Sequence, residues 1–319
     1  MLLEVDKLEK GFKTKRNNIF KVVRSINLEL SAGDITAFLG PNGAGKTTTI
    51  KMIAGLIDPS GGDVLINGNS IIRKRSSALN YFGAVLEGNR NLYWRLTPLE
   101  NFEYWAGIKG VPRSKALERG RELMCYFGLE DKLNTTVQQL SRGMQQQVAI
   151  CTALIHSPPL LLLDEPTLGL DLNASDRIQA LIKDLSSRHN VGILLTTHQM
   201  EVAERLSDHV VIINRGKIIK RGKTKDVLEH FNDRTYIFES EEPISDKLKR
   251  LLEPYNPEYI NPASFKVLLY GLQTPYDIIR VLEPYPIVRF QKDSTDLATA
   301  FRYYTNNDEL MIQGAEEDK

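Results

Sequence analysis

The chain has 319 residues, of which 42% are hydrophobic and 25% charged, and its formal net charge at pH 7 is +1. These values are typical of a folded protein with a core of its own, and the length allows two domains. The near-neutral charge gives no basic footprint for sequence-independent binding to nucleic acid, so we expect no such partner. No apolar run approaches the roughly 18 residues that a membrane-spanning helix needs.

The first residues carry acids where a signal peptide has basic and then apolar residues. We therefore expect a cytosolic protein that reaches a membrane only through a partner. The two cysteines, Cys125 and Cys151, fit no CxxC or metal-binding spacing, so both are expected to be reduced thiols. Basic clusters at 13–16, 73–75 and 217–225 are most simply solvated faces.

In chain order, alternating apolar and polar residues predict strands at 2–8 and 26–30. A basic loop at 13–18 separates them, and Phe12 ends the first strand. An aromatic ring at this position can stack on adenine or pack within the fold, and the residues upstream leave both roles open.

The next feature is a glycine-rich loop between an apolar run at 35–39 and a helical pattern formed by Ile50, Ile53 and Leu56. The loop reads Gly40-Pro41-Asn42-Gly43-Ala44-Gly45-Lys46-Thr47, with Thr48 behind it. It fits the phosphate-binding pattern G-x-x-x-x-G-K-[ST], and its strand–loop–helix setting is the one that this motif requires. A glycine-rich turn that matches by chance is the alternative.

The residue types in the loop suit a nucleotide phosphate. Glycines let the backbone N–H groups point inward, and a helix N-terminus adds its positive dipole end. Lys46 is then expected to reach the β- and γ-phosphates, and the Thr47 hydroxyl to bind magnesium.

Beyond the loop, strands are expected at 63–68 and 82–86, and Glu87 follows the second. From about residue 88 to 140 the pattern becomes helical. Thr97 and Glu100 form a capping box with proline between them, which predicts a helix start. This segment is interpreted as a helical subdomain carried on an α/β core.

Two more motifs follow. Leu140-Ser141-Arg142-Gly143-Met144 opens a helix, and taken alone Ser141 is an N-cap. Residues 160–163 are four leucines that run into Asp164 and Glu165, as expected of a buried strand that delivers carboxylates to its C-terminal edge. A surface turn is the alternative. Gly169-Leu170-Asp171 comes next, and an expected strand at 191–197 ends at His198.

Together these stretches resemble the nucleotide-binding subunit of the ATP-binding cassette (ABC) transporter family over residues 1 to about 230. The match implies a Walker A loop at 40–47, a Walker B strand at 160–164, a D-loop at 169–171 and a signature motif at 140–144. It also implies ATP and Mg²⁺ as ligands, Glu165 as general base, His198 as the switch histidine and Phe12 stacked on adenine. Ser141 and Gly143 would touch the ATP held by an opposing subunit.

Two departures from the family pattern stand out. The signature reads Leu-Ser-Arg-Gly-Met where Leu-Ser-Gly-Gly-Gln is commonest, although Ser141 and Gly143 are retained. Glu87 stands where the family usually has the Q-loop glutamine. A glutamate can still bind magnesium, but its charge differs, which puts in question how hydrolysis is coupled to a partner.

Residues 86–97, together with the Arg-Gly-Met signature, look most like subunits of ABC-2 type exporters, including those for daunorubicin-like drugs. For Tyr93 and Trp94 the simple interpretation is helix packing, whereas the family implies a nearby surface that receives a membrane subunit.

After about residue 232 the motifs stop. Expected strands and helices alternate as β-α-β-β-α-β with a trailing helix, which predicts a small α+β ferredoxin-like domain over 232–306. Residues 307–319 are expected to be an acidic tail.

The sequence therefore predicts a phosphate-loop (RecA-like) α/β core with antiparallel β and helical subdomains in an ATP-binding domain at 1–231. The resemblance implies an ATP hydrolase that powers an ABC-2 exporter of a drug or lipid-like substrate. It would work at the cytoplasmic face of the membrane, with a separate permease, as a homodimer or with a related ATP-binding subunit. A soluble ABC ATPase acting on ribosomes or nucleic acid is the alternative, and a nucleotide-regulated switch with negligible turnover is a third possibility.

Overall fold

The computed structural model describes residues 1–13, 17–86, 91–232, 234–269, 273–293 and 296–305. Glu87 and the expected tail at 307–319 lie outside the described residues. By its contacts the chain divides into two compact units, Met1–Gly222 and Lys223–Lys319. In the described ranges, no helix is long and apolar enough to cross a membrane.

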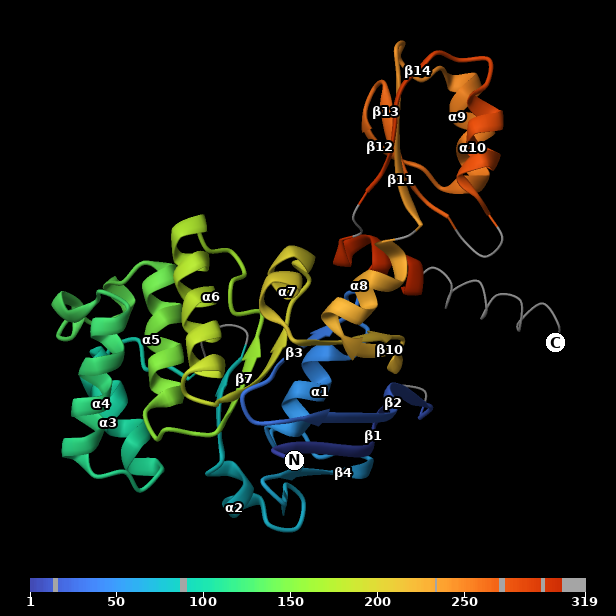
Figure 1. Ribbon diagram of the computed structural model, residues 1–319. Coiled ribbons are helices and arrows are strands. Elements are labelled where there is room, and N and C mark those ends of the chain that lie inside the picture. The colour runs from blue at the N-terminus through green and yellow to red at the C-terminus, as the bar shows by residue number, and fades with distance from the viewer. Residues whose placement is uncertain (14–16, 87–90, 233, 270–272, 294–295, 306–319) are drawn as a thin grey trace. The chain divides into compact units, whose positions relative to one another are not determined.

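Two sheets build the first unit (Figure 1). The larger has the order β10-β9-β3-β8-β7-β6, in which the neighbours from β9 to β6 run parallel. The smaller is antiparallel in the order β2-β1-β4-β5. Their strands are β1 (Leu3–Lys13), β2 (Ile19–Leu30), β3 (Ile35–Leu39), β4 (Gly61–Ile66), β5 (Asn69–Ser70), β6 (Phe82–Val85), β7 (Leu160–Asp164), β8 (Gly192–Thr196), β9 (His209–Asn214) and β10 (Lys217–Lys223).

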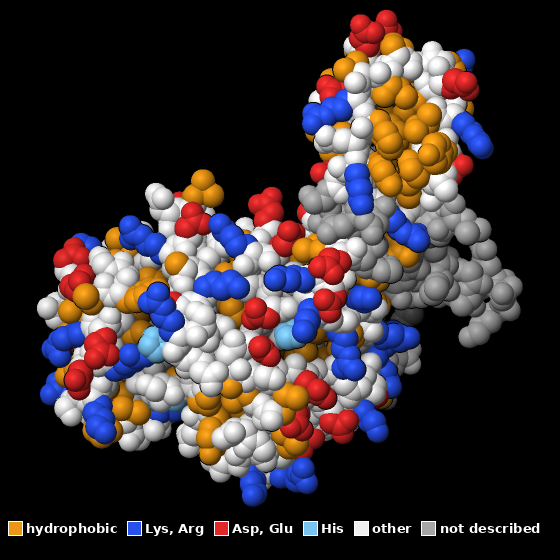
Figure 2. Space-filling model, in the orientation of Figure 1, with side chains coloured by type: hydrophobic (Ala, Val, Ile, Leu, Met, Phe, Trp, Pro, Cys, Tyr) orange, Lys and Arg blue, Asp and Glu red, His pale blue; other side chains and the backbone are white. Residues whose placement is uncertain are grey.

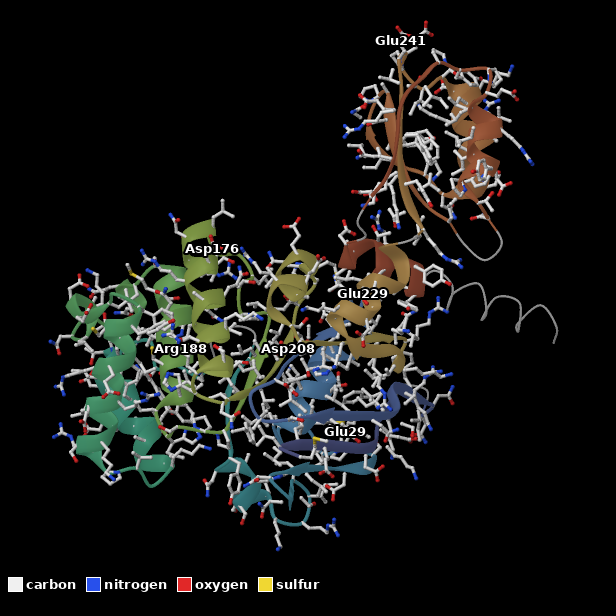
Figure 3. The ribbon with its side chains drawn as sticks, in the orientation of Figure 1. Glu29, Asp176, Arg188, Asp208, Glu229 and Glu241 are labelled. Atoms are coloured by element: carbon white, nitrogen blue, oxygen red, sulfur yellow. The ribbon has the colours of Figure 1, made fainter. Side chains whose placement is uncertain are left out.

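Every residue of β3, β7 and β8 is buried, as expected of strands that are covered on both faces. Asp208, which is labelled in Figure 3, fixes the start of β3. Its carboxylate accepts the Ile35 N–H at 2.9 Å, and its own N–H donates to the Ile35 carbonyl at 2.9 Å. The core helices are α1 (Lys46–Ile53), α2 (Arg75–Leu79), α5 (Arg142–Leu154), α6 (Leu172–Ser187) and α7 (Met200–Leu206).

The expected helical subdomain consists of α3 (Pro98–Ile108), α4 (Arg113–Tyr126) and the short 3₁₀ turns at Glu130–Lys132 and Val137–Gln139. Its capping box is confirmed: the Thr97 side chain accepts the Glu100 N–H, and the Glu100 carboxylate accepts the Thr97 N–H at 2.7 Å. The helices meet at Gly120, where an added Cβ would lie 2.3 Å from the Phe102 ring, so glycine permits the close approach.

The second unit contains a four-stranded antiparallel sheet in the order β12-β13-β11-β14. Its elements are α8 (Thr224–Asn232), β11 (Thr235–Ser240), α9 (Asp246–Leu252), a 3₁₀ turn (Glu253–Tyr255), β12 (Glu258–Asn261), β13 (Ser264–Leu268), α10 (Pro275–Leu282) and β14 (Ile287–Lys292). The chain order from β11 to β14 and the sheet order are those of a ferredoxin-like unit, as predicted. Both α9 and α10 lie on one side of the sheet (Figure 1).

Candidate functional site

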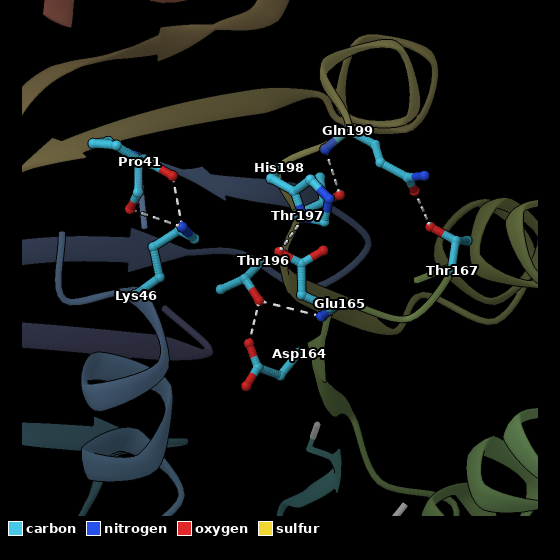
Figure 4. Close-up of polar contacts among 10 residues, drawn as sticks. Pro41, Lys46, Asp164, Glu165, Thr167, Thr196, Thr197, His198 and Gln199 are labelled. Carbon is cyan, nitrogen blue, oxygen red and sulfur yellow. Dashed lines mark hydrogen bonds and ion pairs between the residues drawn. The ribbon is translucent and has the colours of Figure 1, made fainter. Parts of the chain in front are cut away.

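The phosphate loop runs from the end of β3 into α1. Lys46 is the first residue of α1 and is only 8% exposed. Its ammonium donates to the carbonyls of Gly40 at 2.6 Å and Pro41 at 3.1 Å (Figure 4). Burial lowers the pKa of Lys46 below its ordinary value, while the carboxylates of Glu165 and Asp164 act in the opposite direction. The ammonium donates to backbone carbonyls and keeps its positive charge beside two carboxylates, so it can bind an anion such as a phosphate.

Glycines shape the loop. Gly43 and Gly45 have φ of 79° and 110°, in the region that side chains rarely adopt. At Gly40 the reason is space, because a Cβ would lie 2.4 Å from the Ile213 carbonyl oxygen. At Gly43 a Cβ would meet nothing within 4 Å, so this part of the loop borders open space in which a phosphate can lie. The N-cap of α1 carries no side-chain hydrogen bond.

Asp164 ends β7 and pairs in register with Thr196 at the end of β8. The Thr196 hydroxyl donates to Asp164 Oδ1 at 2.5 Å, and the carboxylate is 3% exposed. Its second oxygen, Oδ2, is buried without a hydrogen-bond partner. A buried carboxylate oxygen without a donor is costly unless a cation or a proton meets it.

That unpartnered oxygen fits a magnesium ion, and Thr47 stands directly after Lys46 at the start of α1. Mg²⁺ is commonly held by one or two carboxylates together with substrate phosphates. This suits a site where, among the described residues, no cluster of three or more His, Cys, Asp or Glu side chains could hold a metal by itself. Glu87, the other expected ligand, lies outside the described residues and remains a prediction.

Glu165 follows directly. Its φ of 53° is left-handed, a strained conformation for a residue with a side chain. Its N–H is held by the carbonyl of Thr196 at 3.1 Å, and its Oε1 lies 2.9 Å from His198 Nδ1 (Figure 4). Oε2 is buried without a hydrogen-bond partner. This geometry holds one carboxylate oxygen in place and leaves the other for a water molecule.

A second group of predicted residues lies at the starts of α5 and α6. Ser141 caps α5 by accepting the Met144 N–H at 3.3 Å, and Asp171 caps α6 by accepting the Ala174 N–H at 2.8 Å. An added Cβ on Gly143 would lie 2.8 Å from the Ala174 Cβ, so the two helix starts touch. The signature and the D-loop therefore form one surface, on which Ser141 and Asp171 are exposed.

Phe12 is 43% exposed near the end of β1 and pairs with Phe20 across the hairpin. The Lys10 ammonium lies 5.1 Å from its ring centroid. An exposed aromatic ring is available for stacking on a planar group.

Sequence reasoning missed an apolar groove of about 690 Å³ beside β6. Its lining includes Leu56, Leu79, Phe82, Trp105, Lys109 and His156. The Lys109 ammonium donates to the Leu79 carbonyl, and burial lowers its pKa. Burial, with a smaller contribution from Lys109, also lowers the pKa of His156 to about 4, so this ring is neutral at pH 7. The groove joins residues that are far apart in sequence, which no local pattern could indicate.

Exposed aromatic side chains lie near the start of the helical subdomain. Tyr93 packs edge-on against Tyr104 with ring centroids 4.7 Å apart, and Trp94 is 53% exposed. The expected helix packing of Tyr93 is therefore present, and exposed aromatic area remains beside it. Trp105 contributes both to this aromatic group and to the groove.

Comparison with known proteins places this site in a family. Residues 23–168 match the profile of the family described as ABC transporter. The chain is 37% identical to the ABC transporter ATP-binding protein NatA of Bacillus subtilis over 70% of this chain and 92% of that protein. It is 38% identical to the bacitracin transport ATP-binding protein BcrA of Bacillus licheniformis over 65% of this chain and 66% of that protein.

An importer subunit is also similar. The methionine import ATP-binding protein MetN 2 of Listeria monocytogenes is 34% identical over 83% of this chain and 79% of that protein. Among solved structures, a dimeric post-hydrolysis state of the ATP-binding cassette MJ0796 with ADP and Pi has a TM-score of 0.64 and 27% identity, covering 70% of this chain and 98% of that one. The chain therefore belongs to the ABC transporter ATP-binding subunits, which hydrolyse ATP, form dimers and work with membrane permeases.

Proposed function

We propose that this chain powers export of a drug or lipid-like substrate through a separate ABC-2 type permease at the cytoplasmic face of the membrane. The observation that carries the proposal is the apolar groove beside β6 and the exposed aromatic residues near it. A helix of a membrane subunit suits such a groove, because apolar grooves commonly receive amphipathic helices. The similarity to BcrA, a bacitracin transport protein, supports a drug-like substrate, whereas the similarity to MetN 2, a methionine import protein, favours the opposite direction of transport.

In the proposed reaction, two subunits, either identical or related, hold ATP between the phosphate loop of one and the signature of the other. Lys46 binds the β- and γ-phosphates, and Ser141 and Gly143 contact the nucleotide of the opposing subunit. Thr47 and Asp164 would hold magnesium, which neutralises phosphate charge when bound. Phe12 stacks on the adenine.

Glu165 is the proposed base. Its unpartnered Oε2 accepts a hydrogen bond from the attacking water, and His198 fixes the other oxygen through the 2.9 Å contact. The backbone of Glu165 is held by Thr196, so the carboxylate is positioned before substrate arrives. Asp171 holds the start of α6, where the two subunits would meet.

Co-purification with a groove variant tests the proposal. Glu165→Gln is expressed in its own host, membranes are solubilised with ATP and magnesium, and bound proteins are identified. We expect a stoichiometric partner with about six membrane spans. Adding Leu56→Asp, at the groove, to Glu165→Gln should abolish binding of this partner. Adding Leu251→Asp, in α9, to Glu165→Gln should preserve it. Recovery with ribosomes or nucleic acid would favour the soluble-ATPase alternative, and ATP-dependent dimers without turnover by the native chain would favour a switch.

A further inference from the structure

The second unit has a strand with exposed apolar side chains at the edge of its sheet. In the described part of this unit, β14 hydrogen-bonds to β11 on one side, and its other side is a sheet edge. Val288 is 63% exposed and Phe290 44%. Figure 2 shows hydrophobic side chains gathered on the face of this unit that is turned toward the viewer. Edge strands of this kind template pairing with another strand.

A ladder of aromatic rings leads to that edge. Phe265 of β13 stacks on Phe238 of β11 with centroids 5.3 Å apart, and Phe238 lies 5.0 Å from Phe290 of β14. The three residues are directly opposite one another in the strand register. The two inner rings are 1% exposed, whereas the outermost, Phe290, is 44% exposed. The ladder thus stops at a ring that has a partner on one side only.

The opposite edge of the sheet differs. β12 has four residues, against six in β14, and Glu258 at its start forms an ion pair of 2.6 Å with Arg302. Short length is one of the features that protect an edge strand from pairing. Of the two described edge strands of this unit, β14 is the longer, with six residues and with Val288 and Phe290 exposed.

We propose that β14 is a self-association surface, where it pairs antiparallel with β14 of a second copy of this chain to form a continuous eight-stranded sheet. In a two-fold symmetric pair, the residue at the axis faces its own copy in the second chain. Any other register would put the helix-facing side chains of one chain on the opposite face of the partner sheet. Two registers keep five residues of the strand paired, with either Arg289 or Phe290 at the axis.

The charges and rings select the second register. Arg289 at the axis would face its own copy, and directly opposed like charges destabilise a strand pair. With Phe290 at the axis, Arg289 faces Gln291 of the second copy, and the aromatic ladder continues through two Phe290 rings into the second sheet. Val288 then faces Lys292, whose methylene groups can cover it. The same side chains that are exposed in one copy become buried in the pair.

The test uses the full chain without nucleotide, so that closure around ATP makes no contribution. At about 10 μM, light scattering after gel filtration is expected to report a dimer, since this concentration suffices for a specific interface of ordinary size. Phe290→Asp should raise the Kd at least about 100-fold by opposing two carboxylates at the axis. Ile260→Asp on β12 is the matched control and should remain dimeric.

Circular dichroism of Phe290→Asp must match that of the native chain, so that loss of the dimer is not loss of the fold. A monomeric native chain, or a dimer that persists in Phe290→Asp, would overturn the proposal.

Disulfide trapping then tests the register in a Cys125→Ser background. Facing residues of antiparallel strands have Cα atoms about 4.5 to 5.5 Å apart, within the range of a disulfide. Phe290→Cys should therefore give several-fold more covalent dimer on non-reducing gels than Arg289→Cys. A higher yield from Arg289→Cys, or none from either variant, would contradict the assignment.

Discussion

His198 Nδ1 and Glu165 Oε1 lie 2.9 Å apart, although 33 positions separate the two residues in the chain. The contact exists because Glu165 follows β7 and His198 follows its parallel neighbour β8, so both side chains emerge at the same edge of the sheet. The imidazole holds one carboxylate oxygen, and the other stays buried and without a hydrogen-bond partner. This geometry supports the proposed role of Glu165 as the base.

Replacing Glu165 with glutamine should stop turnover and preserve binding. The amide keeps the size of the side chain but cannot accept a proton, so we expect the ATP turnover number to fall at least about 100-fold. Phosphate release with excess ATP measures turnover, and a fluorescent ATP analogue measures affinity. Glu201→Gln, an exposed change in α7, is the control and should keep native turnover. Brisk multiple turnover by Glu165→Gln would remove this residue from its proposed role.

The Thr196 hydroxyl is expected to stabilise the free protein. It donates to Asp164 Oδ1, and without it the buried carboxylate has neither oxygen paired. Thr196→Val should lower the free energy of unfolding by about 1–3 kcal/mol, measured by urea denaturation without ligand. Thr135→Val in the loop before the second 3₁₀ turn provides a control for the substitution type. Unchanged stability in Thr196→Val would mean that the hydrogen bond contributes nothing net.

The site was predictable because its motifs are contiguous and each strand carries a local signal. The run at 35–39 is apolar except for Thr36 and the run at 160–164 except for Asp164, and they form the buried strands β3 and β7. The ferredoxin-like order of the second unit also followed from alternating elements. The phosphate loop and Asp164 lie at the ends of β3 and β7, where sequence position fixes spatial position.

What the sequence could not provide depends on contacts between distant segments. Nothing near Thr196 marks it as the donor to Asp164, since that contact arises from the pairing of β7 with β8. The helices α2 and α8 were not predicted. α2 has only five residues, too few to show a helical period. The apolar residues of α8 directly follow the basic cluster at 217–225, which was interpreted as a solvated face. The boundary between the two units falls after Gly222, before α8.

The lowered pKa of His156, which lines the groove beside β6, predicts that the folded chain loses stability in acid. Burial lowers that pKa from an ordinary value of 6.5 to about 4. As pH falls below 6.5, His156 binds a proton in the unfolded chain but not in the folded chain. The free energy of unfolding therefore decreases between about pH 6.5 and 4. The expected loss from this group between pH 7.5 and 5.5 is about 1 kcal/mol.

His156→Gln should remove that part of the loss, because glutamine can still donate to the Phe82 carbonyl but does not titrate. Urea denaturation of both proteins at the two pH values measures the difference. His189→Gln, in which the replaced ring is more exposed, is the control. An equal pH dependence in the native chain and His156→Gln would exclude this residue as the cause.

Contact between the signature and the D-loop should be sensitive to one methyl group at Gly143. An added Cβ would lie 2.8 Å from the Ala174 Cβ, closer than such atoms approach, so Gly143→Ala must shift α5 or α6 at their starts. Since Ser141 and Asp171 cap these two helices, the shift misplaces the surface proposed to meet the opposing subunit. Misplacement by about 1 Å can cost roughly 100-fold in rate, so ATP turnover should fall by that order.

Gly107→Ala in α3, where a Cβ meets nothing within 4 Å, should leave turnover unchanged. ATP affinity of the isolated subunit should stay native in both variants because Lys46 and its loop are untouched, and a Gly143→Ala protein with native turnover would show that the two helix starts need no fixed contact.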